Sequence, residues 1–120
     1  SIDGAHAVHP NYTNKSDITN DVILGKGITV KTSASQRYLS DSEATAVVMQ
    51  LCKKTDIPYQ VQVNRSGMPG GQTLGPIVVS YLPMQGADIG IPMLAMHSAR
   101  ELADMRDYQA LVMFLKIFSA

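Results

Sequence analysis

Three side chains that bind divalent metals recur at three-residue intervals near the start of the chain. Asp3, His6 and His9 fall within seven positions, and no cysteine accompanies them. Carboxylate and imidazole groups are ligands that zinc takes from proteins when thiolates are absent. Because the three residues are close in sequence they need not converge on one ion, and one can bind while another supports it from behind. A loop in which these side chains satisfy backbone groups is an equally favoured interpretation.

The last histidine, His97, follows an apolar strand pattern within the segment Pro92–Glu101. Its polar neighbours indicate a loop at the edge of a sheet, in which Glu101 or Arg100 would orient the imidazole or hold the loop. The alternative is a core histidine whose ring is satisfied by backbone groups. Metal sites join distant segments, so His97 is a candidate partner of the N-terminal cluster.

A glycine-rich segment, Ser66–Gly75, leads into a helix start. Thr73 is the candidate N-cap, and Pro76 is tolerated in the first turn. Backbone N–H groups at Gly71 and Thr73 would suit a carboxylate, a carbonyl oxygen or a phosphate. The segment lacks the Gly-Lys-Ser/Thr of a P-loop. A tight turn without a ligand is equally favoured.

Of three further residues, Lys31 has both a functional and an ordinary interpretation. Lys31 ends an apolar strand pattern, where a lysine usually aids solubility but, pointing inward, would pair with an acidic substrate group. Tyr38 is expected to pack in an ordinary way with its hydroxyl in water. Cys52 lies in an apolar helical pattern and is expected in the core.

Periodicity and turn residues predict the elements that must position these side chains. A strand should end at Ser1–Ile2, and a polar loop should cover Asn11–Asp21. Gly25-Lys26-Gly27 predicts a hairpin between short strands at Val22–Leu24 and Ile28–Thr32. A capping box at Ser40–Glu43 should begin a helix that Pro58 closes.

The later elements follow from the same patterns. The apolar face of the capped helix is expected at Ala44, Val47, Val48 and Leu51. Tyr59, Val61 and Val63 alternate with polar residues, which predicts a half-buried strand. A buried helix from Thr73 to Leu82, a strand at Ala87–Pro92 and a helix at Asp104–Ser119, apolar nearly all round, should follow.

Strands that alternate with helices predict a layered α/β domain with a mixed, mainly parallel sheet. Binding residues in such sheets collect in loops at strand ends. Asp3, Gly70–Thr73 and His97 all fall at such positions. We therefore expect these three parts of the sequence to share one site.

Composition excludes several classes of function. The chain has 120 residues, 45% of them hydrophobic, which suits one domain with its own core. Its formal net charge is zero, so no basic surface predicts nucleic-acid binding. No apolar run reaches the roughly 20 residues of a membrane span. The single cysteine and the lack of a signal-peptide pattern favour a reduced, cytoplasmic setting.

Six ordered blocks resemble the aspartyl aminopeptidase family of dinuclear zinc exopeptidases. They are Asp3–Tyr12, Val30–Lys31, Gln36–Tyr38, Gly71–Ile77, Asp88–Pro92 and Met96–Glu101. The resemblance covers nearly the whole chain. It implies a layered α/β/α zinc-exopeptidase fold, of which residues 1–120 would be the C-terminal portion of the catalytic domain. The absence of an initial Met and the apolar end at Ala110–Ala120 agree with a piece of a longer protein.

The resemblance also assigns roles to individual residues. Asp3 and His97 would each bind one of two zinc ions. His6, Lys31 and Tyr38 would contact the substrate, with Lys31 meeting an acidic side chain on its N-terminal residue. Gly71 and Thr73 are placed at the substrate pocket mainly by the helix-start argument. The family's other metal ligands, its glutamate base and its inserted dimerisation domain have no counterpart in this sequence.

The implied function is removal of acidic or neutral N-terminal residues from peptides by zinc-activated water. Gly4, Gln72 and Met68–Gly70 depart from the family's usual residues, and such changes bear on acidic preference more than on metal binding. A homo-oligomer, from dimer to dodecamer, is expected, together with the missing upstream part of the chain. The alternatives are a non-catalytic binding or assembly relative and another dinuclear zinc amidohydrolase.

Overall fold

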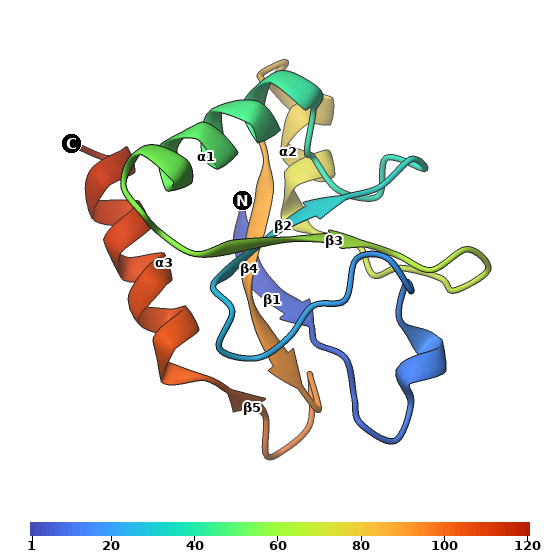
Figure 1. The fold of residues 1–120 in the computed structure, drawn as a ribbon. Coiled ribbons are helices and arrows are strands. Elements are labelled where there is room, and N and C mark those ends of the chain that lie inside the picture. The colour runs from blue at the N-terminus through green and yellow to red at the C-terminus, as the bar shows by residue number, and fades with distance from the viewer.

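The computed structural model describes residues 1–120, which form a mixed sheet with three α-helices (Figure 1). The strands are β1 (Ile2–His6), β2 (Ile28–Thr32), β3 (Tyr59–Val63), β4 (Asp88–Leu94) and β5 (Leu102–Ala103). Their order is β1-β4-β2-β3, with β5 pairing with β4. The parallel pairs β1–β4 and β2–β3 each have five residue pairs, against three for β2–β4 and two for β4–β5. The prediction of a mixed, mainly parallel sheet is confirmed.

The helices are α1 (Ser42–Lys54), α2 (Leu74–Tyr81) and α3 (Met105–Phe118), with a short 3-10 turn at Thr13–Lys15. In Figure 1, α3 and α2 lie on opposite sides of β4. None of the helices has the length and apolarity that a bilayer span requires.

The two faces of the sheet differ in chemistry because successive strand residues point to opposite sides. One face contributes Ile28, Val30 and Ile89 to the core, where they meet Cys52 of α1 and Phe114 of α3. The core role predicted for Cys52 is therefore confirmed. The other face, which we call the polar face, carries side chains at alternating positions and consists of Asp3, Thr29, Lys31, Gln60, Gln62 and Asp88.

The second helix layer, formed by α2, begins on the polar face. Gly75, in the first turn of α2, lies so near Asp88 that a Cβ there would be 3.0 Å from Oδ1 of Asp88. With α1 and α3 covering the apolar face, the layered α/β/α arrangement is confirmed.

The predicted hairpin at Val22–Leu24 and Ile28–Thr32 is wrong. Residues 22–24 form no strand, and β2 pairs instead with β3 and β4. The backbone N–H and carbonyl of Ile23 bond to the side-chain amide of Gln60, at 2.8 and 2.9 Å. That side chain gives Ile23 the hydrogen bonds that a strand partner would have supplied.

Asp107 fixes the glycine turn that follows. Its carboxylate accepts the N–H of Gly25 and the N–H of Gly27, both at 2.7 Å. The φ angles of these glycines are +79° and +101°, in the region that favours glycine. The Asp107 side chain is fully buried, and this one carboxylate is the hydrogen-bond acceptor of both N–H groups.

Replacing Asp107 by asparagine should lower the free energy of unfolding by about 2–3 kcal/mol, because an amide offers one acceptor and turns its own N–H₂ toward the second donor. Urea unfolding measures the change. Asp21→Asn is the matched control, since Asp21 is exposed and should change stability by less than about 0.5 kcal/mol. Equal effects of the two substitutions would contradict the assigned role.

Three expectations about element details are corrected. The N-cap of α1 is Asp41, whose Oδ1 accepts the N–H of Ala44 at 2.8 Å, and not Ser40. The buried face of α1 is Thr45, Val48 and Cys52, while the predicted Val47 is 53% exposed. In β3 the buried side chain is Gln62, and Val63 is exposed. Gln62 is buried because it lies on the polar face beside Lys31, its partner in β2, whereas Val63 ends an edge strand.

Two helices are less buried than their apolar sequences predict. In α2 only Gly75 is buried, and Leu74, Ile77, Val78 and Tyr81 are exposed. In α3 the buried residues are Asp107, Ala110, Leu111 and Phe114, whereas Tyr108, Met113 and Phe118 are exposed. Each helix has one covered side, so apolar composition alone overestimated its burial.

Candidate functional site

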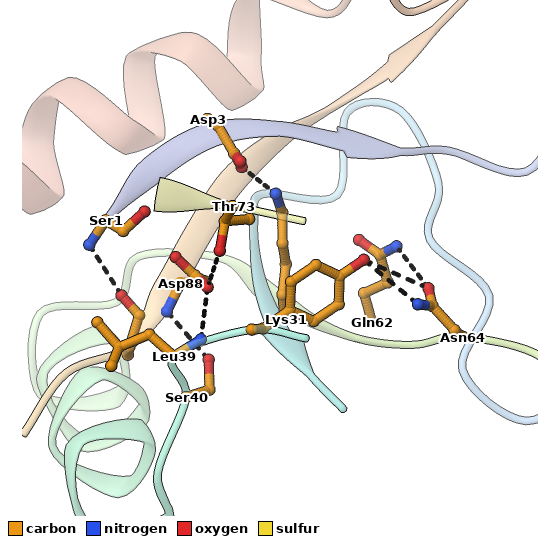
Figure 2. Close-up of polar contacts among 11 residues, drawn as sticks. Ser1, Asp3, Lys31, Leu39, Ser40, Gln62, Asn64, Thr73 and Asp88 are labelled. Atoms are coloured by element: carbon orange, nitrogen blue, oxygen red, sulfur yellow. Dashed lines mark hydrogen bonds and ion pairs between the residues drawn. The ribbon is translucent and has the colours of Figure 1, made fainter. Parts of the chain in front are cut away.

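Asp3 of β1 and Lys31 of β2 form an ion pair across β4 (Figure 2). The strand between them carries Gly90 opposite Asp3. Because glycine has no side chain, the carboxylate and the ammonium can meet above β4. Only Oδ1 of Asp3 is in this pair, and Oδ2 has no protein partner.

Lys31 points inward, so the solubilising interpretation is wrong. The residue is 3% exposed, and its Nζ lies 5.5 Å from the centre of the Tyr38 ring. A buried ammonium is tolerated only when compensated, and here Asp3 and the ring face supply the compensation. Tyr38 is itself buried, and its hydroxyl lies 3.3 Å from Nδ2 of Asn64.

All the metal and substrate residues predicted from the sequence line one cavity of about 280 Å³. These residues are Asp3, His6, Lys31, Tyr38, Gly71, Thr73 and His97. They come from β1, β2, the loops after β2, β3 and β4, and the start of α2. Distant parts of the sequence therefore lie around one cavity, as expected. We call this space the first cavity.

His97 lies in the loop after β4, with a φ of +68°. Its backbone N–H donates to Oε1 of Glu101 at 2.6 Å. Glu101 therefore holds the loop, and it does not orient the imidazole. The ring nitrogens of His97 accept and donate no hydrogen bond within the chain, so the imidazole is available to a ligand.

His6 is held in its neutral form by its surroundings. Burial lowers the pKa of its imidazole below the ordinary 6.5, and electrostatic interaction with Lys31 and with His97 lowers it further. The ring is therefore uncharged at neutral pH and offers one donor and one acceptor to a ligand.

Asp88 ties three segments together at the base of the first cavity (Figure 2). Its Oδ2 accepts the hydroxyl of Thr73 at 2.5 Å and the N–H of Leu39 at 2.6 Å. Its own N–H donates to Oγ of Ser40 at 3.0 Å. Thr73 is thus the N-cap residue by position, but its hydroxyl bonds to Asp88 and not to the helix backbone.

The third member of the N-terminal cluster is separate from the cavity. Nδ1 of His9 accepts the N–H of Asn11 at 3.1 Å, and its ring lies 5.0 Å from that of Tyr12. These contacts give His9 a local role in the loop after β1. The cluster therefore does not form a three-ligand site.

Asp3 and His97 have the chemistry that zinc requires, but they supply only part of a coordination shell. Oδ2 of Asp3 and the ring of His97 both border the first cavity without a protein partner. No group of three or more His, Cys, Asp or Glu side chains in the chain is arranged to hold a metal. A zinc ion normally takes three or four protein ligands, so these residues fit as contributors to a site completed by other groups.

The comparison with known families is decisive. Residues 1–119 match the family described as Aminopeptidase I zinc metalloprotease (M18). The chain belongs to the M18 family. The resemblance seen in the six sequence blocks is therefore confirmed, as is the zinc-exopeptidase fold class.

Named M18 relatives are similar along almost the whole chain. A probable M18 family aminopeptidase 2 from Clostridium novyi is 51% identical over 108 residues, which is 90% of this chain and 25% of the relative. The chain thus spans about a quarter of the length of the curated relatives it matches.

Solved structures share the same fold. The Ape4 and Nbr1 complex contains a chain that is 38% identical, with a TM-score of 0.92, over 98% of this chain and 23% of that one. The PhTET1-12s dodecamer matches with a TM-score of 0.77 and 20% identity, over 98% of this chain and 32% of that one.

Some lining residues were not predicted from the sequence. Gln62, Met93 and Met96 border the first cavity, and Asp88 supports it from below. A carboxylate at the start of an apolar strand was the available signal for Asp88. Gln62 is the partner of Lys31 in the β2–β3 register, so a correct strand pairing would have placed it beside that lysine.

Proposed function

We propose that the complete protein is a zinc-dependent aminopeptidase that removes acidic or neutral N-terminal residues from peptides. Asp3 would bind one zinc ion and His97 a second. The observation that carries the proposal is the first cavity, in which two free metal-binding groups lie beside a buried lysine and a neutral histidine. Membership of the M18 family supports the same reaction.

Zinc, when bound, would supply a water activated for attack on the scissile carbonyl. The residues of this chain would bind and orient the substrate. The Lys31 ammonium would attract a carboxylate on the N-terminal residue, and the Tyr38 ring beside it would narrow the pocket. Neutral His6 can accept or donate a hydrogen bond to the substrate backbone. Because Lys31 is already paired with Asp3, neutral N-terminal residues remain acceptable substrates.

We also propose that the complete protein assembles with copies of itself. The exposed apolar residues of α2, including Leu74, Ile77 and Tyr81, suit burial against other parts of the protein or other subunits. The dodecamer among the structural neighbours supports a homo-oligomer. The substrates would be peptides.

Hydrolysis by the full-length protein tests the proposal. Aminoacyl anilides with Asp, Glu, Ala and Lys at the amino terminus should separate acidic, neutral and basic preferences. Activity should disappear on chelation and return with Zn²⁺, and elemental analysis should find zinc. A metal-loaded protein that hydrolyses none of these substrates would instead indicate the non-catalytic relative. Hydrolysis of non-peptide amides alone would indicate a different zinc amidohydrolase.

A further inference from the structure

Gln62 has a buried side-chain carbonyl that lacks a hydrogen-bond donor. The residue is 6% exposed, and its Oε1 is without a partner. Its Nε2 donates to Oδ1 of Asn64 at 3.4 Å, which turns the amide nitrogen toward Asn64 (Figure 2). Buried carbonyl groups are nearly always paired. An acceptor left unpaired at the wall of a cavity is therefore a place where a ligand N–H would bind.

Gln62 stands where two cavities join. A second cavity of about 310 Å³ lies next to the first, and the two share His6, Gln62, Gly71 and Met93 in their walls. The other orphaned side-chain atoms belong to Thr29, Thr45 and Asp88, and none of these residues lines either cavity. Among these four residues with a buried, unpaired side-chain atom, only Gln62 lines a cavity.

The second cavity suits the chain of a peptide. Lys15 and Arg65 line it, and neither is among the ion pairs of the chain. Its acidic residue, Asp17, directs Oδ1 to its own loop, where it accepts from Thr19 and Asn20 and its pKa falls to about 2. The lining thus carries two cations and one carboxylate, a net positive charge that favours a peptide with a carboxylate of its own.

We propose that the second cavity binds the residues that follow the scissile bond, and that Oε1 of Gln62 accepts the first backbone N–H beyond that bond. The inference rests on the proposed function, in which the first cavity takes the N-terminal residue. The residues that follow the N-terminal residue must then extend into the second cavity past the residues that line both cavities. Gln62 is the specificity-determining residue at this passage, and it distinguishes peptides from short amides.

Two substrates and one variant test the role of Gln62 in the full-length enzyme. A tripeptide has the N–H in question, whereas an aminoacyl anilide with the same N-terminal residue lacks it. Gln62→Leu keeps a similar volume and should lower kcat/KM for the tripeptide about fivefold, the effect of one lost hydrogen bond. The anilide should change less than twofold. An equal fall for both substrates, or no fall for the tripeptide, would overturn the inference.

A matched control and a modified substrate sharpen the test. Gln60→Leu makes the same change two residues away, where the amide is paired with Ile23, and should reduce stability without altering the tripeptide-to-anilide ratio. Replacing the first N–H beyond the scissile bond of the tripeptide by an ester oxygen should lower kcat/KM of the unsubstituted enzyme by the same factor. Gln62→Leu should then cause no further fall in kcat/KM for this ester. Additive losses would overturn the inference. Failure of the proposed function would differ, because the anilide itself would not be hydrolysed.

Discussion

Asp3→Ala in the full-length enzyme is expected to lose zinc and to lower kcat/KM about a thousandfold. The free Oδ2 of Asp3 borders the first cavity, and in the proposed function it is a metal ligand whose removal opens the coordination shell. Loss of the group that activates water removes transition-state stabilisation of roughly 4 kcal/mol, which corresponds to this factor. Elemental analysis of the purified variant and steady-state kinetics on one anilide measure the two effects together.

Two further variants separate metal binding from folding. Asp3→Ala also leaves Lys31 buried without its partner, so Asp3→Asn, which keeps the shape and one oxygen, should show the same loss of zinc with a smaller loss of stability. His9→Ala is the control, because His9 contacts Asn11 and Tyr12 and not the first cavity. It should retain zinc. A fully zinc-loaded Asp3→Asn enzyme would show that Asp3 is not a ligand.

Lys31→Met is expected to lower kcat/KM about a hundredfold for substrates with an N-terminal Asp or Glu. A buried charge pair between enzyme and substrate contributes roughly 2–5 kcal/mol when one partner is removed, and methionine keeps the apolar stem of lysine. Substrates with a neutral N-terminal residue should lose less than tenfold. The ratio of acidic to neutral kcat/KM is therefore the quantity to measure.

The ratio of acidic to neutral kcat/KM also separates a direct role of Lys31 from indirect effects on the site. Loss of Lys31 frees Oδ1 of Asp3, and any resulting change in zinc would alter both substrate classes equally. Lys15→Met is the control, because Lys15 is exposed and its Nζ lies over Tyr12 at 4.9 Å. It should leave the ratio for anilides unchanged. A constant ratio in Lys31→Met would mean that another group selects acidic residues.

The sequence predicted which residues line the first cavity better than it predicted the strand order that brings them together. Asp3, Lys31 and His97 stand in short blocks whose order and spacing are specific, so their convergence could be inferred. How they converge depends on β4 entering between β1 and β2. Local periodicity does not determine the order of strands in a sheet. The glycines at positions 25 and 27 instead suggested a hairpin.

The errors at Gln62 and in α2 have related causes. Alternation in β3 separates two sets of side chains, but it does not say which side chain the rest of the fold will bury, and here only Gln62 is buried. An apolar helix predicts burial, but the surface that would cover Ile77 or Tyr81 is not specified by the helix itself. The roles of Asp88 and Asp107 depend on partners far away in sequence, which no local pattern reveals.

The position of β4 also determines when the site can form during folding. β1 pairs with β4, and paired residues such as Ile2 and Ile89 are nearly ninety residues apart in the sequence. Contacts of such high sequence separation form slowly because a long loop must close first. Until β4 is in place, Asp3 is held near neither Lys31 nor His97. If Asp3 and His97 bind zinc as proposed, metal affinity in this part of the protein would therefore be acquired at a late stage, when the central strand completes the sheet.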